Sequence, residues 1–151
     1  MELIKWLSVA DRHAKMYLDH QLSPFHLNSS HHMYVVKICE NPGITQDQFF
    51  SFFYKNPSNI TRAIAHLEKK GFLIRQRSKT DKRTCRLYPT DKAKEAYPKI
   101  REIIRYGNER LLRDFDEEEQ EEFQRLIKKI ALSAVSMQKE NEEENTWEKE
   151  P

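Results

Sequence analysis

The apolar and polar positions of this chain follow mostly the pattern of amphipathic α-helices. In residues 2–21, apolar side chains recur at intervals of three and four, which places them on one face of a helix. Similar spacing predicts further helices over residues 28–40, 45–53 and 57–70, and from residues 91 and 116 onward. Only residues 72–75 and 85–88 are runs of β-prone side chains. The polar loop between these runs predicts an antiparallel hairpin.

The helix predicted over residues 57–70 has clear signals at both ends. Asn56 can accept hydrogen bonds from the first helical amides, and Pro57 suits the first helical position. Gly71 suits the left-handed residue that ends a helix. The stripe expected to be buried consists of Ile60, Ile64 and Leu67. Helices, a turn, this helix and the hairpin together predict a mainly α chain with a small β-hairpin wing, a winged helix-turn-helix.

Other helix ends carry weaker signals. Residues 28–29 can cap the helix that follows them, and residues 45–48 and 116–119 are typical capping boxes. The short helix after the first box is expected to place all its phenylalanines in the core: Phe49, Phe50, Phe52 and Phe53. Residues 139–151 carry many charges and few large apolar groups, so this acidic tail is expected to fray or to be disordered.

Charge is distributed unevenly, which the formal net charge of +2 hides. Residues 55–88 hold ten Lys or Arg and two Asp or Glu, giving +8, whereas residues 114–151 carry −8. A basic helix and hairpin suit DNA, since the helix can read base edges and the ribbon can contact phosphates or a minor groove. The acidic end should repel phosphate and so discourage indiscriminate binding of polyanions.

Several classes of protein are disfavoured. No apolar run approaches the roughly 20 residues that a membrane span needs, and the N-terminus lacks a secretion signal, so a cytoplasmic protein is expected. Cys39 and Cys85 have no metal-ligand spacing and are expected to be free thiols. The chain has no glycine-rich phosphate loop and no nucleophile motif, so neither enzymatic activity nor a cofactor is expected.

The basic region contains a series of short motifs in fixed order. The motifs are Ser58-Asn59-Ile60-Thr61-Arg62, Leu67-Glu68-Lys69-Lys70-Gly71-Phe72-Leu73, Asp81-Lys82-Arg83 and Leu87-Tyr88-Pro89-Thr90. Together they closely resemble the multiple-antibiotic-resistance regulator (MarR) family of bacterial transcription factors, a resemblance that extends to about residue 138. It implies an obligate homodimer that binds double-stranded DNA at a near-palindromic operator. Such a protein acts as a repressor, or less often an activator, and often responds to a small ligand or oxidant.

The resemblance also suggests how the chain is organised. Residues 1–138 are expected to form a single domain, in which residues 28–89 are the DNA-binding winged helix-turn-helix. Residues 1–22 and 90–138 would supply the dimerisation helices, and residues 139–151 the tail.

DNA-contacting residues are carried over from the family position by position. Four match its groove-facing recognition residues: Ser58, Asn59, Thr61 and Arg62. Asp81 and Arg83 match its wing-tip pair, in which the aspartate orients an arginine that enters the minor groove. The predicted DNA-binding set is completed by His66, Arg75, Arg77, Lys79 and Lys82.

The sequence does not identify the signal that would change DNA binding. Five of the six histidines lie within the first 32 residues, and an effector pocket is expected near His13, Tyr17, His31 and Met33. A metal-dependent regulator of the same fold is an alternative, although the histidines lack acidic or cysteine partners at recognisable spacing, so no metal site is assigned. A winged-helix module that docks protein is a second alternative, but such a module has no need of a +8 surface.

Overall fold

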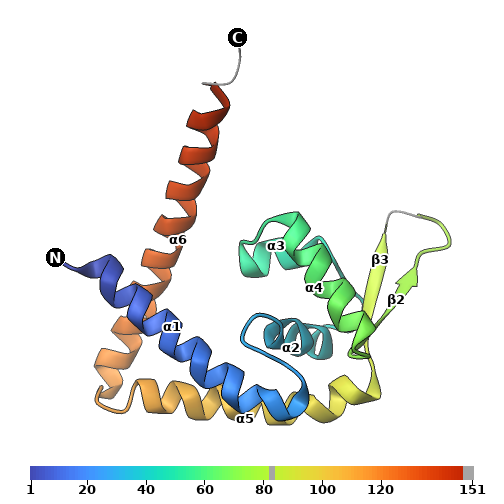
Figure 1. Cartoon of the computed structure of the whole chain (residues 1–151), viewed down its shortest axis with the longest axis horizontal. Helices are drawn as coiled ribbons and strands as arrows, with labels where there is room; N and C mark the ends of the chain where they lie inside the picture. The colour runs from blue at the N-terminus through green and yellow to red at the C-terminus, as the bar shows by residue number, and fades with distance from the viewer. Residues whose placement is uncertain (82–83, 148–151) are drawn as a thin grey trace. The chain divides into compact units, whose positions relative to one another are not determined.

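The computed structural model describes residues 1–81 and 84–147, with side chains described up to residue 144. The chain divides into two compact units, Met1–Glu109 and Arg110–Pro151. The helices of the first unit are α1 (Leu3–Leu22), α2 (His32–Glu40), α3 (Gln48–Phe53), α4 (Pro57–Lys69) and most of α5 (Asp91–Leu111), with a 3-10 turn at Ser23–Phe25 (Figure 1). The second unit contains α6, Glu117–Trp147. The predicted mainly α fold with a small β wing is confirmed.

The end signals of α4 act as the sequence predicts. Asn56 Oδ1 accepts hydrogen bonds from the amides of Ser58 at 2.9 Å and Asn59 at 3.3 Å. At the other end Gly71 has φ +81°, and the amide of Phe72 reaches back to the carbonyl of Leu67 at 2.9 Å. This reverse bond is the mark of a Schellman ending, which frees the chain to turn directly into the wing.

The wing is a three-stranded antiparallel sheet, one strand more than the sequence predicts. Strands β2 (Leu73–Arg77) and β3 (Cys85–Pro89) form the expected hairpin, with Arg75 opposite Leu87. Strand β1 (Ile44–Thr45) pairs with the other edge of β3, so the strand order is β1-β3-β2. Two residues are too few to show a period-2 pattern, and the strand exists because β3 offers it a partner.

The core of the first unit lies among α2, α4, the sheet and α5. Ile60, Ile64 and Leu67 of α4 are all fully buried, as the sequence predicts. The phenylalanines of α3 are divided: Phe49 is fully buried, Phe50 and Phe53 pack against the core, and Phe52 is 44% exposed. The prediction that all four belong to the core is therefore wrong for Phe52. Six residues of helix cannot turn four neighbouring side chains to one face.

Two helix boundaries differ from the predictions. Asn28 Oδ1 accepts hydrogen bonds from the amides of Ser30 and His31, each at 3.0 Å, but this forms a turn, and α2 itself begins at His32. Helix α6 continues to Trp147, whereas fraying or disorder was predicted from Lys139 onward. Its final turns consist largely of Glu, Lys and Gln, which are good helix formers, so an exposed helix needs no apolar face there. Residues 148–151 lie outside the described part.

Helix α6 starts at the predicted capping box. Asp116 Oδ1 accepts a hydrogen bond from the amide of Glu119 at 2.9 Å, and Glu119 Oε2 accepts one from the amide of Asp116 at 3.0 Å. The acidic residues of the first turn also suit the positive end of the helix dipole. The hydrogen bonds that define the start of α6 thus come from residues of its own first turn and N-cap.

Candidate nucleic-acid interface

Helix α4 has two faces with different chemistry. The buried face consists of Ile60, Ala63, Ile64 and Leu67. All of the predicted DNA-contacting residues on this helix are exposed: Ser58, Asn59, Thr61, Arg62 and His66. The apolar face fixes the helix to the core, and the polar side chains on the remaining surface are free to meet a partner.

The polar side chains of α4 are held by hydrogen bonds along the surface. Arg62 Nη2 donates to Asn59 Oδ1 at 2.5 Å, so these two predicted reading residues support each other. Thr61 Oγ1 donates to the carbonyl of Pro57 at 3.0 Å and accepts from Nε2 of Gln46 at 2.6 Å. Gln46, in the turn before α3, was not predicted as a site residue. No sequence signal points to it, because its partner lies 15 residues away and on another helix.

The loop between β2 and β3 is organised by short-range bonds. Ser78 Oγ accepts hydrogen bonds from the amides of Thr80 and Asp81 at 3.3 Å, and Asp81 Oδ2 accepts one from the hydroxyl of Thr84 at 2.9 Å. Asp81 therefore orders the turn itself. The predicted pairing of Asp81 with Arg83 and the predicted contact of Lys82 involve residues outside the described part.

The basic side chains of the wing differ in their exposure and in their contacts with the rest of the first unit. Arg77 and Lys79 are exposed. Arg75 Nε lies 3.2 Å from Glu68 Oε2 of α4, and the Arg75 side chain is only 30% exposed. Arg86 Nη1 donates to the carbonyl of Gly43 at 3.1 Å, beside β1. Arg75 and Arg86 thus hold the wing to its surroundings, which leaves Arg77 and Lys79 as the described wing cations best placed to meet phosphate.

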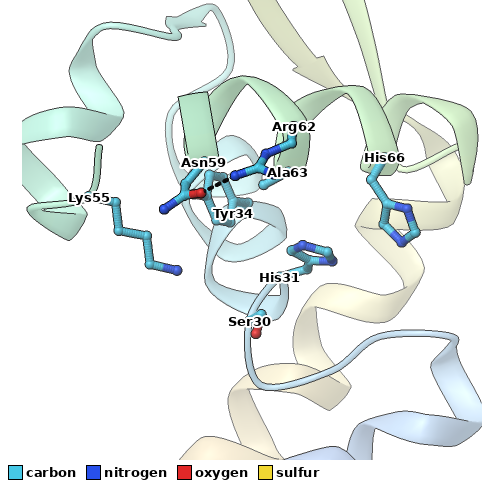
Figure 2. Close-up of a pocket in the computed structure, with 8 residues that line it drawn as sticks. All are labelled: Ser30, His31, Tyr34, Lys55, Asn59, Arg62, Ala63 and His66. Carbon is cyan, nitrogen blue, oxygen red and sulfur yellow. Dashed lines mark hydrogen bonds between the residues drawn. The ribbon is translucent and has the colours of Figure 1, made fainter. Parts of the chain in front are cut away.

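A cavity of about 480 Å³ opens between the residues leading into α2 and the outer surface of α4 (Figure 2). His31 and Tyr34 line it from one side, Arg62 and His66 from the other, and Lys55 from the turn before α4. The imidazole rings of His31 and His66 lie 4.9 Å apart between centroids. The Tyr34 ring packs on Phe49 and Phe53, and Lys55 Nζ lies 5.9 Å from its centroid.

Burial changes the titration of the histidines near this cavity. Burial lowers the pKa of His31, and the neighbouring cationic groups of His66, Lys55 and Lys70 lower it further. Burial also lowers the pKa of His32. A hydrogen bond at 3.2 Å between its Nδ1 and the carbonyl of Asn28 acts in the opposite direction, but burial is the larger effect. The neutral imidazole is therefore favoured at both positions in the free protein.

The four residues predicted around an effector are not gathered at this cavity. Of the four, only His31 lines it. His13 is exposed and bonded to the carbonyl of Val9 on its own helix, whereas Tyr17 donates to the carbonyl of Ile103 on α5 at 3.2 Å. Met33 is half-buried against the core. Within residues 1–81 and 84–147, no group of three His, Cys, Asp or Glu side chains could hold a metal ion.

Comparison with known proteins gives a match to the region that contains α2, α4 and the wing. A model of the MarR family matches residues 27–85, from the approach to α2 through the wing. The HTH-type transcriptional regulator YybA of Bacillus subtilis (strain 168), itself described as uncharacterized, is 32% identical over 104 residues, which cover 69% of this chain and 69% of YybA. The chain belongs to the MarR family. It is a MarR-family DNA-binding transcriptional regulator and not an enzyme.

Solved structures extend the likeness beyond the matched region. A Listeria monocytogenes structure described as a MarR-family transcriptional regulator complexed with 26mer DNA is 28% identical, has a TM-score of 0.79, and covers 88% of this chain and 89% of its own. A MarR protein from Peptoclostridium difficile is 26% identical, with a TM-score of 0.83 and coverage of 91% and 90%. The predicted winged fold with N- and C-terminal helices is confirmed. Among the described residues, no helix combines the length and apolar character that a membrane crossing requires.

Proposed function

We propose that this MarR-family regulator is a homodimeric, cytoplasmic repressor that binds a near-palindromic operator and is released by a small-molecule effector. The observation that carries the proposal is the two-faced α4, which keeps Ser58, Asn59, Thr61 and Arg62 exposed. A helix of this kind in a winged helix-turn-helix lies in the major groove, where such side chains can read base edges. The regulator from Listeria that was solved with 26mer DNA supports this reading of the fold.

Exposed apolar side chains support a dimer. In α1, Leu3, Ile4, Trp6 and Met16 are exposed to between 44% and 80%. Large apolar side chains are also exposed on α6: Phe123, Leu126, Leu132 and Met137. A second copy of the chain can cover such surfaces, as in most symmetric oligomers. Sedimentation at low micromolar concentration should then give about 36 kDa, twice the chain mass of 18.1 kDa, and a clean monomer would exclude this assembly.

The operator-binding test begins with selection of duplexes from random sequence. Arg62→Ala should weaken binding to the selected duplex more than binding to mixed genomic DNA, because a base-reading arginine contributes roughly 1–3 kcal/mol of discrimination. Arg113→Ala is the matched control, since Arg113 is exposed, pairs with Asp114 at 3.5 Å and is not among the predicted DNA-contacting residues. An equal loss on both DNAs would reduce Arg62 to a phosphate anchor.

Salt dependence separates this function from the protein-docking alternative. Binding through phosphates releases counterions, so the logarithm of the affinity should fall linearly with the logarithm of the salt concentration. If no duplex is selected and binding to mixed DNA is absent at low salt, the proposal fails.

Pretreatment with a chelator addresses the metal-dependent alternative, because only a metal-dependent repressor would lose its affinity for DNA.

A further inference from the structure

Among the described residues that line the cavity between the start of α2 and α4, the charged side chains are all basic. Figure 2 shows Lys55, Arg62, His31 and His66 around the same space, contributed by three separate parts of the chain. No Asp or Glu is among the described residues that line it. Glu68 of α4 pairs with Arg75 at 3.2 Å and Asp19 of α1 accepts a bond from the amide of Ser29 at 2.7 Å, so both carboxylates already have partners.

Two donors at this cavity have hydrogen-bonding or charge capacity to spare. Arg62 Nη2 bonds the neutral amide oxygen of Asn59, which leaves its charge without a carboxylate in that contact. The Tyr34 hydroxyl is buried, and within the described part of the chain it has no hydrogen-bond partner. A buried hydroxyl without a partner calls for a specific explanation, such as an ion or ligand that supplies an acceptor.

His31 adds a response to pH. His31 faces His66 and Arg62 on α4, Lys70 at the end of α4, Lys55 in the turn before it and Tyr34 in α2. Burial and the surrounding positive charge keep the pKa of His31 low, and burial raises the pKa of Tyr34, which stays neutral. An oxyanion placed among these groups would reverse the sign of the local field and favour the protonated imidazole of His31.

We propose that this cavity binds an oxyanion, and that protonation of His31 strengthens the binding. The oxyanion can come from either of two sources with the same chemistry. One is a backbone phosphate of bound DNA, and the other is a free phosphate-type anion that competes with DNA. Only the first source rests on the proposed DNA-binding function. In either case Arg62 belongs both to the cavity and to the exposed surface of α4, so occupancy of the cavity bears directly on DNA binding.

The first arm of the test measures affinity for a selected duplex from pH 7.5 to 6.0 in phosphate-free buffer at constant ionic strength. If a DNA phosphate is the ligand, affinity should rise by at least about fivefold, since each proton taken up on binding can contribute up to tenfold per pH unit. His31→Gln should flatten this rise, and His66→Gln, which removes a neighbouring basic group from the cavity, should lower the affinity. His20→Gln is the matched control, because His20 is exposed on α1 and is not among the residues that line the cavity. His66 is exposed, so its variant remains informative even if His31→Gln unfolds.

The second arm titrates inorganic phosphate into the DNA-free protein at pH 6.0 and follows the imidazole proton resonances by NMR. Phosphate should shift the His31 and His66 resonances, assigned from the two variants, and leave His20 unchanged if a free anion is the ligand. A pH response in the first arm with no shift in the second would assign the cavity to a DNA phosphate. Identical pH profiles for all variants, together with silent resonances, would overturn the proposal. If the protein binds no DNA, the proposed function fails, while the phosphate titration still decides whether the cavity binds an oxyanion.

Discussion

The N-cap of α4 offers a direct test of how this helix is held. Asn56 Oδ1 accepts two backbone amides, at 2.9 and 3.3 Å, and also the Ser58 hydroxyl at 2.5 Å. Asn56→Ala removes all three bonds and should lower the free energy of unfolding by about 1 kcal/mol, within the roughly 0.5–2 kcal/mol found for lost caps. For a chain of this size that corresponds to a melting temperature lower by roughly 2–4 °C. Urea unfolding followed by far-UV circular dichroism measures the change.

Asn56→Asp separates stability from DNA affinity. The carboxylate keeps the capping acceptor and favours the positive helix end by about 0.3–1 kcal/mol, so stability should hold or rise. DNA affinity should fall, because a new negative charge lies beside the groove-facing residues and repels phosphate. Fluorescence anisotropy with the selected duplex measures this effect.

The control for the cap is Asn108→Ala. Asn108 is exposed within α5, where the same substitution should stabilise the chain by a few tenths of a kcal/mol through helix propensity. If Asn56→Ala leaves the urea midpoint within error of the unmodified protein, the cap does not hold α4. If Asn56→Asp raises both stability and DNA affinity, then α4 does not face phosphate at this end.

Three further outcomes follow from the packing of the first unit. Ile64→Ala truncates a fully buried side chain of α4 and should cost about 2–5 kcal/mol in urea unfolding; a cost below 1 kcal/mol would contradict tight packing there. Gly107→Ala would place a Cβ 2.8 Å from Cε1 of Tyr17, so the melting temperature should fall although alanine favours helix, and a rise would refute the contact. Acidification from pH 7.5 to 5 should lower the free energy of unfolding, because burial lowers the pKa of His32 and the unfolded chain takes up its proton first. This loss should shrink in His32→Gln, and an unchanged pH profile would show that His32 titrates alike in both states.

Local chemistry made much of α4 predictable. Asn56, Pro57 and Gly71 act on atoms within a few residues, so their effect can be deduced without knowledge of the fold. The same holds for the capping box of α6. Strand β1 escaped prediction because its stabilising partner, β3, lies more than 40 residues later in the chain.

The cavity escaped prediction for the same reason. The sequence predicts His66 as a DNA contact and His31 as an effector contact, and nothing in it indicates that their rings lie 4.9 Å apart. Arg75 gives a second example, since the sequence assigns it to phosphate without indicating that it pairs with Glu68 in the structure. Net charge predicts which region is basic. Which basic side chains pair within the protein, and which remain exposed without such a pair, depends on tertiary contacts.

The division of α4 into a buried and an exposed face has a consequence for how its sequence can change. The side chains that hold the helix in place are Ile60, Ala63, Ile64 and Leu67, and none of them belongs to the predicted reading set. A library randomised at Ser58, Asn59, Thr61 and Arg62 should therefore yield mostly folded members, as surface substitutions usually change stability by less than about 0.5 kcal/mol. The chain can in this way diversify its target sequence while the scaffold that presents it stays the same.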